Sequence, residues 1–267
     1  MKISLPAILL AASACLGTTA TGHADGGLRV KPWFAVSTVR MGGLESFPEA
    51  AFMLEKVSWE SVGMLVTKAQ RGIDWAAVEG IEIDYQVDPF VRAGMKIGYL
   101  RTEKSYFKAV GEKAGFTFED TWNSSSEMIL GMFGASFILP VDERTRFCTA
   151  LFLGAGFARV DITRRLRTDT DFGSFLDCAF AGARGTAFVP EFSVEIEHDL
   201  TESLAAGAGL GYRFGGVGSF EYLAPADLSL SGLAKYDAGE QVRDGLGGLL
   251  TADYGGLFLS FFICAKI

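Results

Sequence analysis

The sequence predicts an all-β fold, a closed antiparallel eight-stranded transmembrane β-barrel with short periplasmic turns and long extracellular loops. Three observations predict it: strands that alternate apolar and polar residues, connections that alternate short and long, and an apolar final strand. In that final strand, 254–267, Leu257, Leu259 and Phe261 share one face, and Ser260 and Lys266 share the other. An apolar edge of this kind is an aggregation hazard on a soluble sheet. It is explained if the apolar face contacts lipid and the edge pairs with the first strand.

Eight segments have the composition and length of membrane-crossing strands. A barrel strand needs roughly 9–11 residues at a steep tilt to cross a bilayer. The predicted strands cover residues 29–40, 79–87, 90–101, 126–139, 146–161, 185–198, 203–214 and 254–267.

The faces of these strands differ in polarity with a period of two, which separates lipid from the barrel interior. In the second strand Ile81 and Ile83 alternate with Glu82 and Asp84. The third, sixth and seventh strands alternate in the same way. The fourth and fifth are less regular, because both of their faces contain Leu, Phe and Ala. Aromatic residues near the strand ends predict two interfacial girdles, formed by Trp33, Phe34, Phe90, Phe137 and Phe147 on the turn side and Tyr99, Phe157, Tyr212, Phe214 and Tyr254 on the loop side.

The connections between strands alternate in length, as in bacterial outer-membrane barrels. Tight turns rich in Pro, Asp, Glu and Thr are predicted at 88–89, 140–145 and 199–202, and long loops at 41–78, 102–125, 162–184 and 215–253. The first long loop contains a predicted surface helix near 47–56, with Ser46 as its N-cap.

A ten-stranded barrel is the alternative, since residues 58–67 and 218–236 also have strand character. It is disfavoured because it would reverse which connections are short and periplasmic.

The N-terminal residues predict a secretion signal peptide at 1–24, which leaves one outer-membrane β-barrel domain at 25–267. Lys2 is the charged region, an apolar stretch follows it, and Gly22-His23-Ala24 fits the small-x-small cleavage pattern. Outside this segment no run of 18 apolar residues exists, although the mean hydropathy of +0.26 is high. These observations exclude a helical membrane protein and leave a membrane β-protein, located in the outer membrane of a two-membrane bacterium.

Charged residues on the inward faces of the strands are the candidate functional residues. Their balance predicts an ion-pair network that fills a narrow barrel interior, because unpaired buried charge is costly. A narrow conduit or gate built from the same charges is the alternative. The predicted lumen charge network consists of the acids Glu82, Asp84, Glu191, Glu195 and Glu197 and the bases Lys31, Arg92, Lys96, Arg213 and Lys266.

Other chemistry is weakly supported by the sequence. After the signal, three cysteines remain, with Cys148 and Cys264 in strands and Cys178 in a loop, interpreted as small apolar residues. The single histidine after the signal, His198, lies beside a periplasmic turn, away from the long loops, so we expect no enzyme. Asp169 and the residues after it lack the Gly and Glu of a calcium loop. No cofactor and no metal site is predicted.

From residue 25 onward the chain resembles the small outer-membrane β-barrel family, whose best-known domain is the barrel of outer membrane protein A. The features that support the resemblance are the signal ending at Ala24, the eight alternating strands, and the stretch from Phe192 to Phe214, which is similar to a hairpin of that family. The family usually ends in Phe or Trp, and this chain ends in Ile267.

The resemblance implies a monomeric anchor whose function resides in its loops, where specificity is concentrated in such scaffolds. We expect a structural or surface-binding, adhesin-like role, with a small passive channel as the alternative and a soluble periplasmic lipid-binding barrel as a weaker one. The expected partners are outer-membrane lipid, the barrel-assembly machinery during insertion and an unidentified loop ligand. Nucleic acid is not expected, because the net charge is −8.

Overall fold

Eight strands close into a barrel in the computed structural model, which describes residues 27–227, 235–243 and 248–267. Each strand of the ring pairs antiparallel with both neighbours, and the first strand pairs with the last, as in Val30 opposite Ala265. The predicted fold class, with eight strands, is confirmed. In ring order the strands are β1 (Leu28–Thr38), β3 (Trp75–Asp88), β4 (Val91–Thr102), β6 (Phe116–Pro140), β7 (Thr145–Thr170), β8 (Gly173–Asp199), β9 (Leu204–Arg213) and β15 (Gly256–Lys266).

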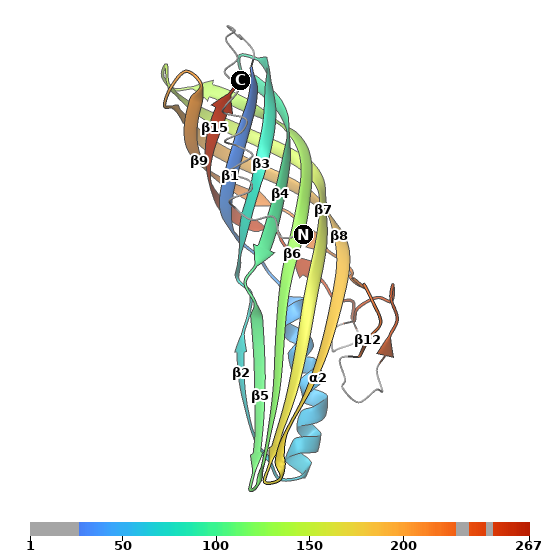
Figure 1. Cartoon of the computed structure of the whole chain (residues 1–267). Coiled ribbons are helices and arrows are strands. Elements are labelled where there is room, and N and C mark those ends of the chain that lie inside the picture. The colour runs from blue at the N-terminus through green and yellow to red at the C-terminus, as the bar shows by residue number, and fades with distance from the viewer. Residues whose placement is uncertain (1–26, 228–234, 244–247) are drawn as a thin grey trace.

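Tight turns join the strands at one end of the barrel, as predicted. They span residues 89–90, 141–144 and 200–203, and Figure 1 shows the C-terminus at this end. The carboxylate of Asp142 orders one of these turns by accepting hydrogen bonds from the backbone N–H groups of Arg144 at 2.8 Å and Thr145 at 2.7 Å.

Three strands continue far beyond the opposite end of the ring. β6, β7 and β8 contain 25, 26 and 27 residues, more than twice what a bilayer crossing requires. The predictions of long loops at 102–125 and 162–184 are therefore wrong. The second of these segments is a continuous hairpin, and the first contains β5 (Ser105–Lys113), which pairs with β6.

A further strand, β2 (Leu65–Arg71), pairs with the other edge of β5. Together these strands form a sheet that projects from the barrel (Figure 1). We call it, with the helix behind it, the outer extension. Its sheet consists of β2, β5 and residues 116–127, 159–170 and 173–184 of β6, β7 and β8.

The helix α2 (Gly42–Ser61) lies against this sheet and is longer than the predicted 47–56. Its N-cap is Met41, not Ser46, whose hydroxyl instead donates to the carbonyl of Gly43 at 3.2 Å. Packing explains the greater length, because Leu44 and Phe52 are both buried in the same core as the sheet. Tertiary burial stabilises the extra turns, as is usual for short helices.

In the described part of the last outer connection, between β9 and β15, each strand has two residues. β11 pairs with β8, with Glu221 opposite Arg184, so this connection contacts the extension. The strand character seen at 218–236 corresponds in part to these elements; residues 228–234 lie outside the described part of the chain. The short strands are β10 (Gly216–Val217), β11 (Glu221–Tyr222), β12 (Ala226–Asp227), β13 (Lys235–Tyr236) and β14 (Ala252–Asp253).

Two residues assigned to the aromatic girdles point inward instead. Trp33 is 5% exposed and Tyr254 is fully buried, with its hydroxyl bonded to that of Ser126. The assignment of these two residues to the membrane interface is therefore wrong. A period of two counted from Lys31 places Trp33 inside, so strand parity was the better guide than residue type.

The predicted signal peptide, 1–24, lies outside the described residues, and the division of the chain at Ala24 stays a prediction. In the part of the chain that the structure describes, no helix is long and apolar enough to cross a membrane.

Candidate functional site

Exposed apolar side chains form a band on the outer wall, with members on all eight strands of the ring. Along β6, Ile129, Phe133 and Leu139 are each more than half exposed, and apolar side chains on the outward faces of the other ring strands are exposed as well. With a rise of about 3.3 Å per residue and a tilt of about 40°, the stretch from Ile129 to Leu139 spans roughly 25 Å. This height equals that of the lipid-facing band of outer-membrane barrels.

The outward face becomes polar at one level on four adjacent strands. Arg101, Glu127, Arg159 and Arg184 stand side by side, since Glu127 pairs with Arg101 and Arg159, and Arg159 pairs with Arg184. The next outward-facing residue of β6 toward the short turns, Ile129, is apolar. A wall with an apolar band that ends in a row of charges is stable only in a bilayer.

The protein is an eight-stranded outer-membrane β-barrel.

Comparisons with known proteins give loose structural likenesses. No family model and no curated protein matches the chain. The attachment invasion locus protein Ail of Yersinia pestis, solved in complex with the heparin analogue sucrose octasulfate, is 10% identical with a TM-score of 0.34, covering 91% of this chain and 99% of its own. The outer membrane protease OmpT of Escherichia coli is 9% identical with a TM-score of 0.30, covering 93% and 99%. The assignment of the barrel rests on the strand pairing and the lipid-facing band.

Inside the barrel, near the short turns, three arginines converge on Glu197. Arg29 Nη2 donates to Glu197 Oε2 at 2.6 Å, Arg92 Nη1 donates to the same oxygen at 3.1 Å, and Arg146 Nε lies 3.4 Å from Oε1. Asp84 lies 3.9 Å from both Arg29 and Arg92. These residues come from β1, β3, β4, β7 and β8, so this cluster bridges the barrel across its interior.

Two smaller clusters form the next layers. Lys31 Nζ lies 2.8 Å from both Glu82 Oε1 and Glu195 Oε2. Glu191 receives Lys96 Nζ at 2.5 Å on one oxygen and Arg213 Nε at 2.8 Å on the other. All of these side chains are buried. Each charge therefore has an opposite charge within contact distance, as burial requires.

The structure places nine of the ten predicted network residues in these buried clusters. The tenth, Lys266, lies at the rim, where its side chain is 23% exposed and Nζ is 2.6 Å from Asp199 Oδ1. Sequence reasoning missed Arg29, which is buried and takes the place expected of Lys266. Its parity with Lys31 on β1 was a signal that could have found it.

The half of the lumen that lies toward the extension is filled mainly by apolar side chains. Trp33, Met132, Phe152 and Phe258 fill it and continue the hydrophobic core of the extension. A glycine on the neighbouring strand makes room, because Gly211 of β9 pairs with Phe258 of β15 and a Cβ on Gly211 would lie 2.4 Å from the Phe258 ring. Charged clusters fill the end of the lumen near the short turns, the charged layer, and mainly apolar side chains fill the rest, the apolar layer. The two layers meet where Lys96 Nζ lies 4.2 Å from the centre of the Trp33 ring.

Both thiols inside the lumen contact arginines. Arg29 Nη2 lies 2.8 Å from Cys264 Sγ, and Arg92 Nη1 lies 3.8 Å from Cys148 Sγ. Cys178, predicted in a loop, lies instead in the extended part of β8, where it is exposed. All three cysteines are free thiols.

In the outer extension the inward faces of the strands are apolar and pack against α2. The edge of the Phe47 ring meets Trp122 with 5.7 Å between ring centroids, and Phe52 lies 5.5 Å from Phe107. One ion pair is buried within this core. Arg164 donates to both carboxylate oxygens of Asp120 at 3.0 Å, and Trp122 Nε1 donates to the same carboxylate at 2.9 Å.

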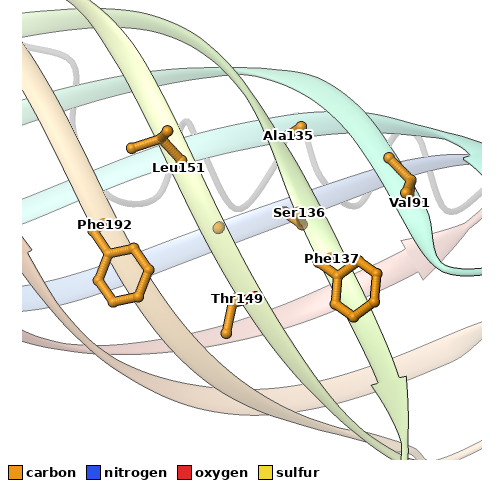
Figure 2. Close-up of a pocket in the computed structure, with 8 residues that line it drawn as sticks. Val91, Ala135, Ser136, Phe137, Thr149, Leu151 and Phe192 are labelled. Atoms are coloured by element: carbon orange, nitrogen blue, oxygen red, sulfur yellow. The ribbon is translucent and has the colours of Figure 1, made fainter.

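Two hollows on the described surface are shallow and lie outside the lumen. One, of about 240 Å³, lies on the lipid-facing wall across β6, β7 and β8, where the small side chains of Ala135 and Thr149 leave space between Phe137, Leu151 and Phe192 (Figure 2). The other, of about 200 Å³, lies beside the turn at Asp142.

Two titratable groups, His198 and Asp142, lie at the short-turn end of the barrel. His198 Nδ1 lies 3.1 Å from Thr145 Oγ1 on the exposed surface. The backbone N–H groups of Arg144 and Thr145 hold the pKa of the Asp142 carboxyl below its usual range. No group of three or more His, Cys, Asp or Glu side chains suited to a metal ion occurs among the described residues. The expectation that the chain has no enzymatic activity stays a prediction.

Proposed function

We propose that this outer-membrane barrel has a non-enzymatic surface-binding role, with the barrel as the anchor and the outer extension as the binding element. The observation that carries the proposal is the continuation of three barrel strands into a projecting sheet that is braced by α2. Loops that merely connected the strands would not need this construction.

The filled lumen supports a role outside the barrel. The charged layer links strands across the interior through Glu197, Glu191 and Lys31. The apolar layer next to it is closed by Trp33 and Phe258. Solute passage would require separating buried ion pairs and moving packed aromatic rings, both of which cost several kcal/mol.

The reach of the extension also supports binding to a surface. From the charged row at Glu127 to the turn before Phe116 the strand rises roughly 35 Å. Continuous pairing of β5, β6, β7 and β8 over this length keeps the sheet ordered. The distal end is therefore held well outside the membrane at a fixed distance.

The test uses the exposed thiol of Cys178 on intact cells. The full chain is displayed on a laboratory host with two membranes, and attachment to cultured epithelial cells is counted. Biotin-maleimide followed by streptavidin covers the extension at Cys178, whereas Cys148 and Cys264 are buried. We expect the block to abolish attachment and the same treatment of Cys178→Ser to leave it intact.

A second placement of the block serves as a matched control. Asp237→Cys in the Cys178→Ser background puts streptavidin on the last outer connection, at an exposed position. Attachment that survives the block at Cys178 but not at position 237 contradicts the proposal. Stable single-channel openings of the purified protein in planar bilayers would favour a passive channel instead.

A further inference from the structure

The distal end of the outer extension gathers three turns. These are residues 62–64 between α2 and β2, 114–115 between β5 and β6, and 171–172 between β7 and β8. The turns touch one another, because Lys113 Nζ donates to the carbonyl of Val62 at 2.6 Å and a Cβ on Gly115 would lie 2.8 Å from Asp171 Oδ2. Figure 1 shows this end farthest from the short turns of the barrel.

Exposed apolar side chains lie in these turns and in the helix and strand ends beside them. Phe172 is 96% exposed, Leu65 71% and Val57 69%. A single exposed apolar residue on a water-facing surface is ordinary, but a group at the tip of a projecting sheet indicates an interaction site. We call this group the distal cluster; it consists of Val57, Val62, Leu65, Phe116, Phe172 and Phe175.

The shape of the distal cluster suits a fluid partner. Its side chains stand on the end of α2, on the turns and on the adjoining strand ends, so a rigid protein surface would need a matching cavity to cover them. A bilayer interface adapts to any convex shape. Backbone groups beside the turns are already paired, since Thr170 pairs with Gly173 and Lys113 pairs with Phe116. Entry into an apolar phase therefore leaves few polar backbone groups unsatisfied.

We propose that the distal cluster inserts into the interface of a second lipid bilayer, opposed to the membrane that holds the barrel. This inference rests on the proposed surface-binding role and names the surface. The bilayer that holds the barrel lies roughly 35 Å away along the strands.

The charge around the cluster indicates which lipid it binds. Three acids, Glu60, Glu112 and Asp171, outnumber the two bases, Lys56 and Lys113, at this end of the described chain, and Lys56 Nζ lies 3.5 Å from Glu60 Oε1. Anionic headgroups are therefore repelled, and a zwitterionic phospholipid such as phosphatidylcholine is the expected target. The same charged groups set how deeply the cluster enters the bilayer. The acids and Lys113 stay at the level of the headgroups, and the phenyl rings reach the boundary of the acyl chains.

The first experiment places an environment-sensitive NBD fluorophore next to the cluster. The full chain, carried in lipid nanodiscs, bears Ser174→Cys in a Cys178→Ser background, so that every apolar residue of the cluster remains. Added phosphatidylcholine vesicles should raise the NBD emission and shift it to the blue. The matched control, Thr163→Cys on the outward face of β7, should show no change. The absence of a response at position 174 overturns the inference.

The second experiment removes the apolar side chains. Replacing Phe116, Phe172 and Phe175 by Ser should weaken vesicle binding by about tenfold for each phenyl ring lost. Thr121→Ala with Asn123→Ala, on the outward face of β6, should leave binding unchanged. Adding anionic phosphatidylglycerol to the vesicles should weaken binding at low salt and less so at high salt. Equal binding by the Ser variant contradicts the inference.

The two proposals fail separately. If the block at Cys178 abolishes cell attachment while vesicles give no NBD response, the extension binds a protein, and only the bilayer inference falls. If vesicles bind through the distal cluster but the block at Cys178 leaves cell attachment unchanged, the proposed role of the extension falls.

Discussion

The barrel and the outer extension use the same three strands, β6, β7 and β8, and the outward faces of these strands have opposite polarity in the two regions. Within the barrel the inward residues of β8 include Glu191, Glu195 and Glu197, and the outward residue Phe192 faces lipid. Within the extension the inward faces contain Trp122 and other apolar residues, and the outward faces contain charged and hydroxyl side chains. The outward face changes from apolar to polar at the charged row of Arg101, Glu127, Arg159 and Arg184, whereas the inward face of β8 becomes charged only at Glu191, nearer the short turns.

The difference shows that the surroundings of a strand, and not its backbone, decide which face is apolar. Lipid surrounds the barrel, so its apolar side chains face out and its charges pair inside. Water surrounds the extension, so its apolar side chains face α2. One continuous ladder of β6, β7 and β8 serves both environments because strand geometry is the same in each.

The largest expected effect comes from breaking the charged layer. Glu191→Gln leaves Lys96 and Arg213 buried without their carboxylate, which should destabilise the barrel by about 3–5 kcal/mol. Urea unfolding in lipid vesicles measures the change. Glu119→Gln, on the outward face of the extension, is the control, because its exposed pair with Lys108 contributes little. A loss below about 1 kcal/mol for Glu191→Gln would show that the network is not needed for the closed barrel.

A somewhat smaller effect should mark the level of the membrane. Phe133→Arg puts a charge in the middle of the lipid-facing band and should cost about 2–4 kcal/mol. Thr121→Arg, on the same face of β6 but in the extension, should change the unfolding free energy by less than about 0.5 kcal/mol. Equal costs for the two substitutions would contradict the polarity reversal.

Removing a buried methylene group from the core of the extension should lower stability only locally. Ile162→Val removes one buried methylene group and should cost about 1 kcal/mol. Hydrogen exchange should quicken for amides of the outer extension and stay unchanged in the ring. Faster exchange at Lys96 or Glu195 would show that the two regions unfold as one unit.

The smallest expected effect concerns the turn at Asp142. Backbone N–H donors lower the pKa of this carboxyl in the folded protein, so its contribution to stability is present above the unfolded pKa of about 3.9 and is lost as pH falls through the lowered folded pKa. Asp142→Ala should therefore lower the melting temperature at pH 7, and the difference from wild type should shrink in acid. The exposed neighbour Glu143→Ala provides the comparison.

The alternation of inward- and outward-facing residues along the strands was sufficient to predict the barrel. The alternation of Ile81 and Ile83 with Glu82 and Asp84 fixed both the period and the inward face. Counting on from Lys31 would also have placed Arg29 and Trp33 inside. The extension was missed because its strands continue without a break while their polarity reverses, and the bilayer length was used as a limit on strand length.

The buried pair Asp120–Arg164 shows a second limit of sequence reasoning. On the sequence Arg164 is one of several arginines beside aspartates, and the pairing that buries it depends on the register of β6 with β7. The distal cluster was missed for the same reason, since its residues come from three segments that only the folded sheet brings together.

Glu197 also constrains how the barrel enters its membrane. Its cationic partners Arg29, Arg92 and Arg146 belong to β1, β4 and β7, which lie around the circumference of the ring. An open sheet cannot bring the three arginines to one carboxylate, so a partly assembled intermediate would expose unpaired charges to lipid. Insertion and closure are therefore expected to be a single cooperative event, with the interior kept hydrated until β1 pairs with β15.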